Sequence, residues 1–109
     1  MTTIKSLIER LLAAVPDLRP VYDEHLSDND DLLPHVFFGD VTRFAIENAA
    51  TPTVANLLVV LDDGLSDADA EVREVVLASF VENLAGETAA LKLLKPKMGL
   101  ILRRAFAST

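Results

Sequence analysis

Apolar residues recur along this chain with the spacing of amphipathic helices. Over residues 4–15 they follow the i, i+3, i+4, i+7 pattern of one helical face. Thr3 is a suitable N-cap for this segment, and Pro16 ends it because proline cannot continue a helix. We therefore expect a first helix whose inward face carries Ile4, Leu7, Ile8, Leu11, Leu12 and Val15.

Two further helices are expected on either side of a polar segment at residues 27–30. Asp17 is the expected N-cap of the first, with Pro20 in its first turn. The four short polar residues then compete for backbone hydrogen bonds and predict a break. The next helix should run from residue 31 or 32 to about 49, with Asp30 or Asp31 as N-cap and Pro34 in its first turn. The expected inward positions are Leu18, Val21, Tyr22 and His25 or Leu26 on the first helix, and Leu33, Val36, Phe37, Val41, Phe44, Ala45 and Asn48 on the second.

The second half of the chain predicts one unusually apolar helix and several shorter ones. Residues 53–65 are apolar around most of the helix, which is typical of a central helix packed on more than one side. A cap-rich break at 66–69 precedes a helix over 70–85, with Gly86 placed for a C′ cap. Two turns are expected over 87–94 and a last helix over 96–107, which Gly99 weakens. The inward residues of these last helices are expected to be Val72, Val75, Val76, Ser79, Phe80 and Leu84, then Leu100, Ile101, Ala105 and Phe106.

These elements predict an all-α fold in a single domain spanning residues 1–109. Half of the residues are apolar, which is enough for one core. No segment favours a strand, because the valine-rich run at 57–61 continues a helical pattern. Short loops place neighbouring helices antiparallel. We expect five or six antiparallel helices, in a compact bundle or a short α-solenoid.

Composition also narrows the compartment and the class of protein. Cysteine is absent, so disulfides and thiolate metal sites are excluded, and a reducing compartment is favoured. Lys5, Glu9 and Arg10 interrupt the N-terminal segment, which lacks the apolar core of a signal peptide. No run approaches 18 apolar residues. We expect a cytoplasmic protein with no membrane partner, and the sequence indicates no particular oligomeric state.

Charge is both negative overall and unevenly distributed. The formal net charge is −7, which repels nucleic acid and favours encounter with basic partners, although excess acid can also serve solubility alone. One acidic stretch contains a single base, Arg19, among six acids: Asp17, Asp23, Glu24, Asp28, Asp30 and Asp31. A second contains a single base, Arg73, among Asp62, Asp63, Asp67, Asp69, Glu71 and Glu74. The C-terminal bases are Lys92, Lys95, Lys97, Arg103 and Arg104. These bases lack interleaved aromatic residues, so a solvated face or internal pairing is expected rather than a nucleic-acid site.

Candidate chemical sites are few. The acidic run beginning at Asp28 fails the calcium-loop template, because its sixth position is Leu33 and its twelfth is Gly39. His25 and His35 lie near Glu24, Asp28 and Asp40 in sequence, so an acid–base or metal cluster is conceivable, but no helical ligand spacing supports it. Serine nucleophile motifs and glycine-rich phosphate loops are missing. We expect no enzyme activity, cofactor or metal.

Two residue pairs point to interfaces. Phe37 and Phe38 project about 100° apart on one helix, so one should face the core and the other outward, where it anchors a partner or covers a seam between helices. Asp62 and Asp63 end a helix, where negative charge opposes the helix dipole. These carboxylates therefore need a partner, for which Arg73 is an internal candidate.

Residues 66–84 resemble one helix of a HEAT-type repeat. An Asp precedes the Val72–Arg73 pair, and small and aliphatic residues then continue to Leu84. A clear second copy is missing, which argues against a repeat array. This resemblance implies that any solenoid is short.

Residues 7–84 resemble a family of small acidic helical proteins from bacterial toxin–immunity loci, including those of contact-dependent inhibition. The resemblance rests on Leu18-Arg19-Pro20-Val21-Tyr22-Asp23-Glu24-His25, on Asp28 to Asp40 with its Leu-Pro-His-Val segment and Gly39-Asp40, on Val59 to Leu65 and on the Val72 to Leu84 helix. It implies an immunity protein that binds one cognate toxin. Many such toxins are nucleases with basic clefts, which an acidic protein could occlude.

The expected function is therefore neutralisation of a toxin domain with a basic surface, or alternatively a HEAT-like adaptor that binds another host protein. Carboxylates would pair with bases of the partner, and an exposed aromatic residue would anchor the contact. The candidate partner-binding residues are Tyr22, Asp23, Glu24, Asp28, Asp30, Asp31, Phe38, Asp40, Asp62, Asp63, Asp69 and Glu71.

Overall fold

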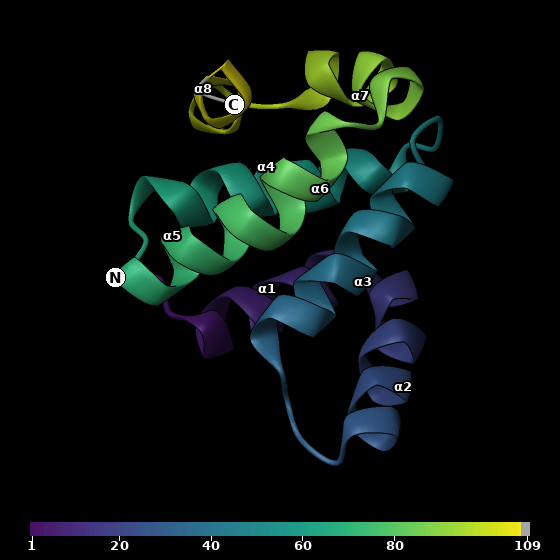
Figure 1. The fold of residues 1–109 in the computed structure, drawn as a ribbon, viewed down its shortest axis with the longest axis vertical. Helices are drawn as coiled ribbons and strands as arrows, with labels where there is room; N and C mark the ends of the chain where they lie inside the picture. Colours follow the sequence, from purple (N-terminus) through teal and green to yellow (C-terminus); the bar gives the residue numbers. More distant parts are fainter. Residues whose placement is uncertain (108–109) are drawn as a thin grey trace.

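A computed structural model describes residues 1–107 and is helical throughout apart from its loops (Figure 1). The only β contact in this part is an isolated bridge between Thr2 and Ala68, so the all-α prediction is confirmed. The helices are α1 (Ile4–Ala14), α2 (Arg19–Asn29), α3 (Pro34–Glu47), α4 (Thr53–Ser66), α5 (Ala70–Val76), α6 (Glu82–Ala85), α7 (Thr88–Leu94) and α8 (Leu100–Ala107). A π-helical turn, Leu77–Val81, joins α5 and α6 into one continuous helix. Counted that way, residues 1–107 hold seven α-helices rather than five or six.

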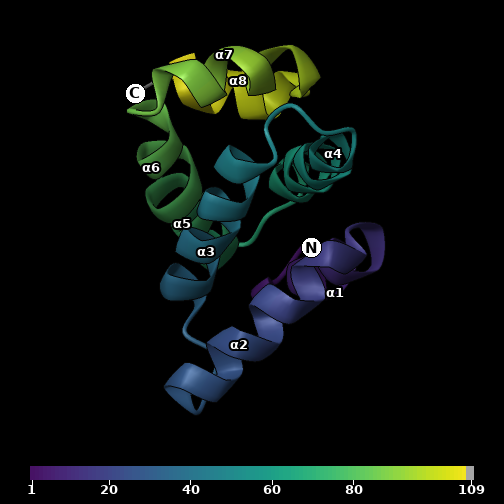
Figure 2. The same ribbon diagram turned by 90° about the vertical axis from the view of Figure 1, so that its right-hand side faces the viewer.

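The helices enclose one core, with α4 near its centre. α4 packs against α1, α5 and α8, which confirms its predicted central position. α3 packs against the continuous helix 70–85, and α2 packs against α3. Figure 2 shows α2 at one end of the molecule and α7 with α8 at the other. The radius of gyration is 12.7 Å, close to the roughly 13 Å expected of a globular domain of this length. The arrangement is therefore a compact bundle rather than an elongated solenoid.

The helix ends show where local sequence signals succeeded and failed. Thr3 caps α1 through a reciprocal capping box with Ser6, as expected. Asp17 caps nothing, because it lies inside a 3₁₀ turn, Pro16–Leu18, that leads directly into α2. Asp69 caps α5 by accepting the Val72 N–H. Gly86 does end α6, but with φ −80° it is right-handed, so its predicted C′ conformation is wrong.

The start of α3 differs most from the prediction. α2 continues through the expected break to Asn29 and ends where Asp30 takes a left-handed conformation with φ 60°. Neither Asp30 nor Asp31 caps α3; the N-cap position is Leu33, and Pro34 is the first helical residue. Proline is favoured there because its missing N–H would be unpaired anyway.

The inward face of α3 is also rotated from the prediction. It carries Phe37, Phe38, Val41, Thr42 and Ala45, all of them buried. Val36 projects almost opposite to the centre of this face, and it is 47% exposed rather than inward. Leu33 precedes the helix and is 42% exposed, so its predicted inward position is also wrong. Leu100, likewise expected to pack, is 62% exposed on α8.

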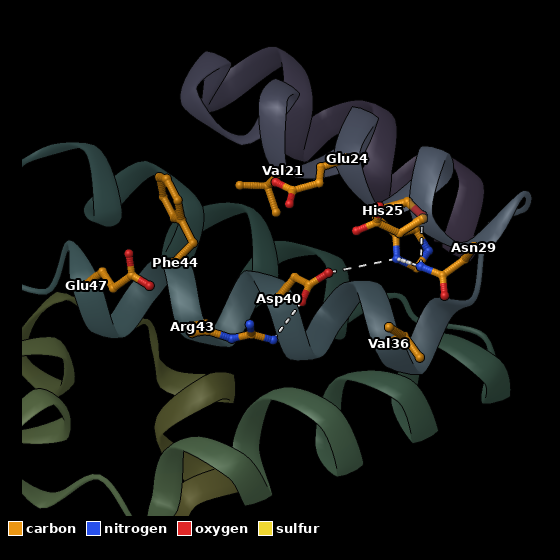
Figure 3. Close-up of a pocket in the computed structure, with 10 residues that line it drawn as sticks. Val21, Glu24, His25, Asn29, Val36, Asp40, Arg43, Phe44 and Glu47 are labelled. Carbon is orange, nitrogen blue, oxygen red and sulfur yellow. Dashed lines mark hydrogen bonds and ion pairs between the residues drawn. The ribbon is translucent and has the colours of Figure 1, made fainter.

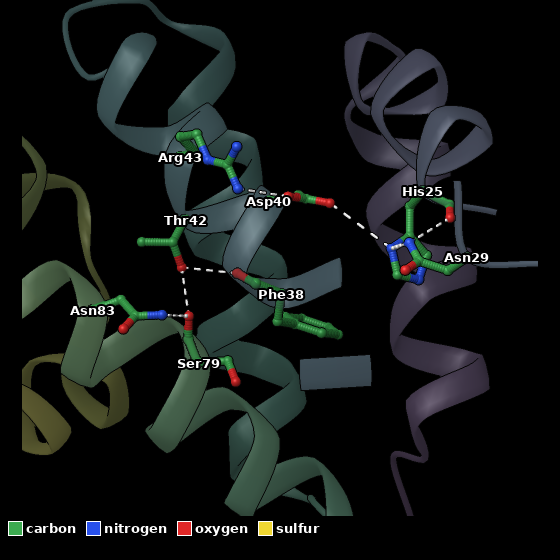
Figure 4. A network of polar contacts seen from close by, with 8 residues as sticks. All are labelled: His25, Asn29, Phe38, Asp40, Thr42, Arg43, Ser79 and Asn83. Carbon is green, nitrogen blue, oxygen red and sulfur yellow. Dashed lines mark hydrogen bonds and ion pairs between the residues drawn. The ribbon is translucent and has the colours of Figure 1, made fainter. Parts of the chain in front are cut away.

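A polar network ties α3 to the π-helical turn (Figure 4). The Thr42 hydroxyl lies 2.8 Å from the Phe38 carbonyl and 2.7 Å from the Ser79 carbonyl, so both share its single proton. The Asn83 side chain also donates to the Ser79 carbonyl, at 2.9 Å. These donors satisfy a carbonyl where the regular helical pattern is interrupted.

Asp62 and Asp63 both find partners within the chain, although neither is Arg73. Asp63 pairs with Arg10 of α1. Asp62 accepts the Leu102 N–H at 2.8 Å and so caps α8 from the neighbouring helix α4. The negative charge of Asp62 is therefore placed at the positive end of α8.

Gly99→Ala is expected to lower the free energy of unfolding by about 1–2 kcal/mol. A Cβ at position 99 would overlap the Asp62 carboxylate, which would have to move away from the start of α8. Urea denaturation measures the change. Gly39→Ala is the control, because its Cβ would meet nothing within 4 Å and alanine favours helix. Equal stability changes at both glycines would contradict this account of the cap.

Candidate functional site

A groove of substantial size lies between α2 and α3 (Figure 3). Its volume is about 460 Å³, and it is open to solvent along one side. α2 contributes Val21, Glu24, His25, Asp28 and Asn29, and α3 contributes Val36, Asp40, Arg43, Phe44 and Glu47. We call these ten residues the α2–α3 groove.

Few buried side chains hold α2 in place, and His25 is the only buried residue within the helix itself. Leu18 is fully buried at its start, and His25 is 2% exposed at its middle. The Tyr22 ring packs edge-on against the Phe37 ring, with centroids 5.3 Å apart. The Arg19 guanidinium lies 5.8 Å from the centre of the Tyr22 ring, on its outer side. Tyr22 is therefore partly committed to the fold and is not a freely projecting anchor.

His25 connects both walls of the groove to the loop between them. Its Nε2 accepts the Leu33 N–H at 3.0 Å, so the neutral ring must carry its proton on Nδ1. Nδ1 lies 3.8 Å from the Asp40 carboxylate on α3. The Asn29 side chain donates to the backbone carbonyl of His25 at 2.8 Å, and its amide nitrogen also lies 3.2 Å from the ring Nδ1. His25 thus sets the position of the 30–33 loop, in agreement with a structural role for this histidine.

The charges of the groove are predominantly negative. Glu24 and Asp28 on α2, and Asp40 and Glu47 on α3, face one base, Arg43. Arg43 donates to Asp40 at 2.8 Å, and its side chain is 70% exposed. Val21, Val36 and Phe44 supply apolar surface in the same groove. The lining therefore suits a ligand that is cationic and partly apolar.

The structure brings together three of the predicted partner-binding residues and separates the rest. Glu24, Asp28 and Asp40 line the groove. Phe38 is fully buried, so the prediction of an exposed aromatic anchor at this position is wrong. The remaining predicted residues lie outside the groove. Asp23 forms an ion pair with Arg19, Asp30 ends α2, and the Asp31 carboxylate accepts the Leu32 N–H. Glu71 is exposed on α5, and the roles of Asp62, Asp63 and Asp69 are those described for the helix ends and ion pairs above.

The sequence prediction included only Asp40 among the five residues that α3 contributes to the groove. Val36, Arg43, Phe44 and Glu47 share the outer side of α3 with Asp40, because positions 36, 40, 44 and 47 follow helical spacing. This spacing was present in the sequence. The predicted inward position is wrong for Val36, whereas Phe44 is half-buried and both packs against the core and lines the groove.

A second pairing that the sequence did not suggest joins His35 to Ser79. His35 Nδ1 lies 2.8 Å from the Ser79 hydroxyl, and Nε2 lies 4.0 Å from a Glu74 oxygen. The arrangement has the residue types of a nucleophile, base and orienting acid. Ser79 is only 6% exposed, however, so a substrate carbonyl could not reach its hydroxyl. We interpret the contact as a structural hydrogen bond that links the start of α3 to the π-helical turn.

The basic C-terminal helices lie at the opposite end of the molecule from α2 (Figure 2). Lys97 donates to the Ala49 carbonyl at 2.9 Å, and Arg103 donates to the carbonyls of Lys95 and Pro96. At least these two bases therefore bind backbone rather than the acidic groove.

Two further features of the described chain bear on function. Within residues 1–107, no three His, Cys, Asp or Glu side chains gather closely enough to hold a metal ion. None of the helices in that range is both long enough and apolar enough to cross a bilayer.

Comparison with known proteins finds one family. No curated protein and no solved structure matches the chain. The family described as "Domain of unknown function (DUF7674)" matches residues 8–108, which is nearly the whole chain and includes both walls of the groove. The protein belongs to this family.

Proposed function

We propose that the protein is an immunity-type inhibitor, which binds a toxin domain with a basic surface through the α2–α3 groove. The observation that carries this proposal is the groove itself, in which four carboxylates and three apolar side chains face a single arginine. Carboxylates arranged this way complement Lys and Arg side chains and speed the encounter with a basic partner. The choice of a toxin among basic partners comes from the sequence resemblance.

Inhibition would follow from occlusion. A nuclease binds phosphates with a basic cleft, and an acidic protein seated on that cleft both repels the substrate and blocks its path. The groove residues Glu24, Asp28 and Glu47 are exposed and lie on both helices, so they can reach a partner surface together. The overall charge of −7 adds long-range attraction to the same partner.

Charge reversal in the groove tests the proposal. The binding partner for the test is sought as a toxin domain encoded by a neighbouring gene. The triple variant Glu24→Lys, Asp28→Lys and Glu47→Lys is expected to weaken binding to that domain at least a hundredfold, because three attractive pairs become repulsive. The matched control, Glu71→Lys, Glu82→Lys and Glu87→Lys, makes the same change of charge on exposed residues elsewhere. Titration calorimetry at two salt concentrations gives the affinities, and a cleavage assay gives the inhibition.

The results separate three cases. The groove variant should lose binding and inhibition, while the control should stay within about tenfold of the unchanged protein, because it alters only the long-range field. A larger loss in the control would place the interface near the exposed glutamates at residues 71–87 instead. Binding that is indifferent to salt would count against the electrostatic mechanism.

A protein-binding adaptor remains the alternative, because the groove specifies the chemistry of a partner and not the consequence of binding. The same cleavage assay distinguishes the two roles. A partner that stays fully active in a saturated complex would indicate an adaptor.

A further inference from the structure

The apolar surface of the groove is concentrated at its two ends. Val36 lies at the end near the 30–33 loop and is 47% exposed, so its side chain is accessible to a ligand. Phe44 lies eight residues further along α3, or about 12 Å at 1.5 Å per residue. Val21 of α2 lies at the same end as Phe44 (Figure 3). A ligand could therefore place apolar side chains at two points about two helical turns apart.

The position for a cation lies between these ends. Asp40 is four residues from both Val36 and Phe44 on α3, and Glu24 faces the same space from α2 (Figure 3). The Asp40 carboxylate already accepts a hydrogen bond from a guanidinium, that of Arg43. Arg43 comes from the chain itself and is 70% exposed, so it can move aside at little cost.

We propose that the groove takes one amphipathic helix of the partner, which places apolar side chains at both ends and a Lys or Arg on Asp40 in place of Arg43. This inference rests on the proposed function, because it names the part of the basic partner that the groove receives. Residues seven apart on a helix are about 10.5 Å apart along its axis, which matches the spacing of the two apolar ends. Arg43 then acts as an internal competitor for the cation of the partner.

A helix suits the walls of the groove better than an extended strand does. Both walls are helices, whose backbone groups are already paired along most of their length. An extended segment would find few backbone partners there, whereas a helix brings its own backbone hydrogen bonds. Recognition therefore depends on side chains, and charge complementarity selects a basic helix.

The chain's own C-terminal end carries related chemistry but not as one helix. Leu93 and Leu100 are 51% and 62% exposed and are seven residues apart, with bases around them. They lie on α7 and α8, which a 3₁₀ turn at Lys95–Lys97 separates. A second copy of this chain could not present them from a single helix, so we commit to a foreign helix.

The test uses a synthetic helical peptide of roughly 15 residues, long enough to span the groove. It carries leucines seven residues apart, Lys and Arg on the same face, and alanine elsewhere. Amide shifts of the ¹⁵N-labelled full chain locate the site, and their titration gives the affinity. We expect shifts confined to α2 and α3 and an affinity that falls as salt is raised.

Matched variants test the role of each charge. Asp40→Asn should weaken peptide binding about fivefold or more, while Asp23→Asn, the same change on the outer side of α2, should alter it less than twofold. Arg43→Met should tighten binding about threefold or more, beyond the change seen with Arg73→Met on α5. Thermal melting of each variant confirms that the fold is kept.

Four outcomes would overturn the inference. The first two concern peptide affinity: Asp40→Asn and Asp23→Asn change it equally, or Arg43→Met raises it no more than Arg73→Met does. The third is that a peptide whose helix is broken by a central proline binds as tightly as the intact peptide. The fourth is that the amide shifts are centred outside α2 and α3. Sedimentation that shows the chain binding itself through the groove would also replace the foreign helix with a second copy. Failure of the proposed function gives a different result: the peptide would still bind, but the unchanged protein would not inhibit the toxin.

Discussion

Phe38→Ala is expected to lower the free energy of unfolding by about 3–5 kcal/mol. The Phe38 side chain is fully buried and packs edge-on against Phe37, with ring centroids 5.6 Å apart. Truncation removes these contacts and leaves a cavity between α3 and its neighbours, which the helices can close only in part. Urea denaturation, with an unchanged slope, measures the loss.

Val36→Ala is the matched control for Phe38→Ala. Val36 is on the same helix but is 47% exposed, so its truncation should cost less than about 1 kcal/mol. The difference between the two losses in the free energy of unfolding distinguishes a core residue from a groove residue. A Phe38→Ala protein that kept its stability and lost only partner binding would mean that Phe38 is an exposed anchor, contrary to its burial.

His25→Ala is expected to cost about 2–3 kcal/mol, the second largest effect. The imidazole is 2% exposed, lies 5.7 Å from the Phe37 ring and accepts the Leu33 N–H. Its removal leaves a cavity and a backbone donor without a partner at the start of α3. His25→Phe keeps most of the volume but not the acceptor, so it should recover part of the loss. Thermal and urea denaturation measure both variants.

His35→Ala is the natural comparison, because these two are the only histidines. The His35 side chain is 52% exposed and makes one hydrogen-bonding contact, with the Ser79 hydroxyl, so its removal should cost about 1 kcal/mol. Imidazole ¹⁵N shifts provide an independent check, since neutral His25 should carry its proton on Nδ1. A proton on Nε2, or equal losses from the two alanine variants, would contradict the role given to His25.

The acidic residues divide into two kinds that their sequence positions do not distinguish. Some serve the fold: Asp62 caps α8, Asp69 caps α5 and Asp63 binds Arg10. Others, such as Glu24 and Glu47, have no such role and face the groove. Net charge therefore overstates the acidity that a partner would meet, and three of the carboxylates without such a role, Glu24, Asp28 and Glu47, lie together in the groove.

Much of the fold could be predicted because it depends on local signals. The Thr3 cap, the proline that ends α1 and the apolar faces of α1 and of the continuous helix 70–85 all act within a few residues. The errors arose where two local signals competed. At residues 27–34, the polar residues predicted an early break, yet α2 continues to Asn29. The Leu33 N–H, just before α3, is accepted by the His25 ring rather than by an aspartate.

The candidate site was predictable only in part, for a related reason. Helical spacing was enough to identify faces, but not to decide which face of α3 is covered. Phe37 and Phe38 are adjacent, and both are buried because the helix 70–85 and α2 pack against α3 from different directions. That packing turns Val36 and Asp40 toward the groove.

Helix content, most helix ends and the acidic character of the protein were thus readable from the chain, since each depends on residues close in sequence. Tertiary structure alone decided which carboxylates are used internally, that Gly99 gives room to Asp62, and that α2 and α3 form a groove. These features depend on contacts between residues far apart in the sequence, such as Arg10 and Asp63, which are 53 positions apart, and pairing over such distances leaves no periodic trace in a single sequence.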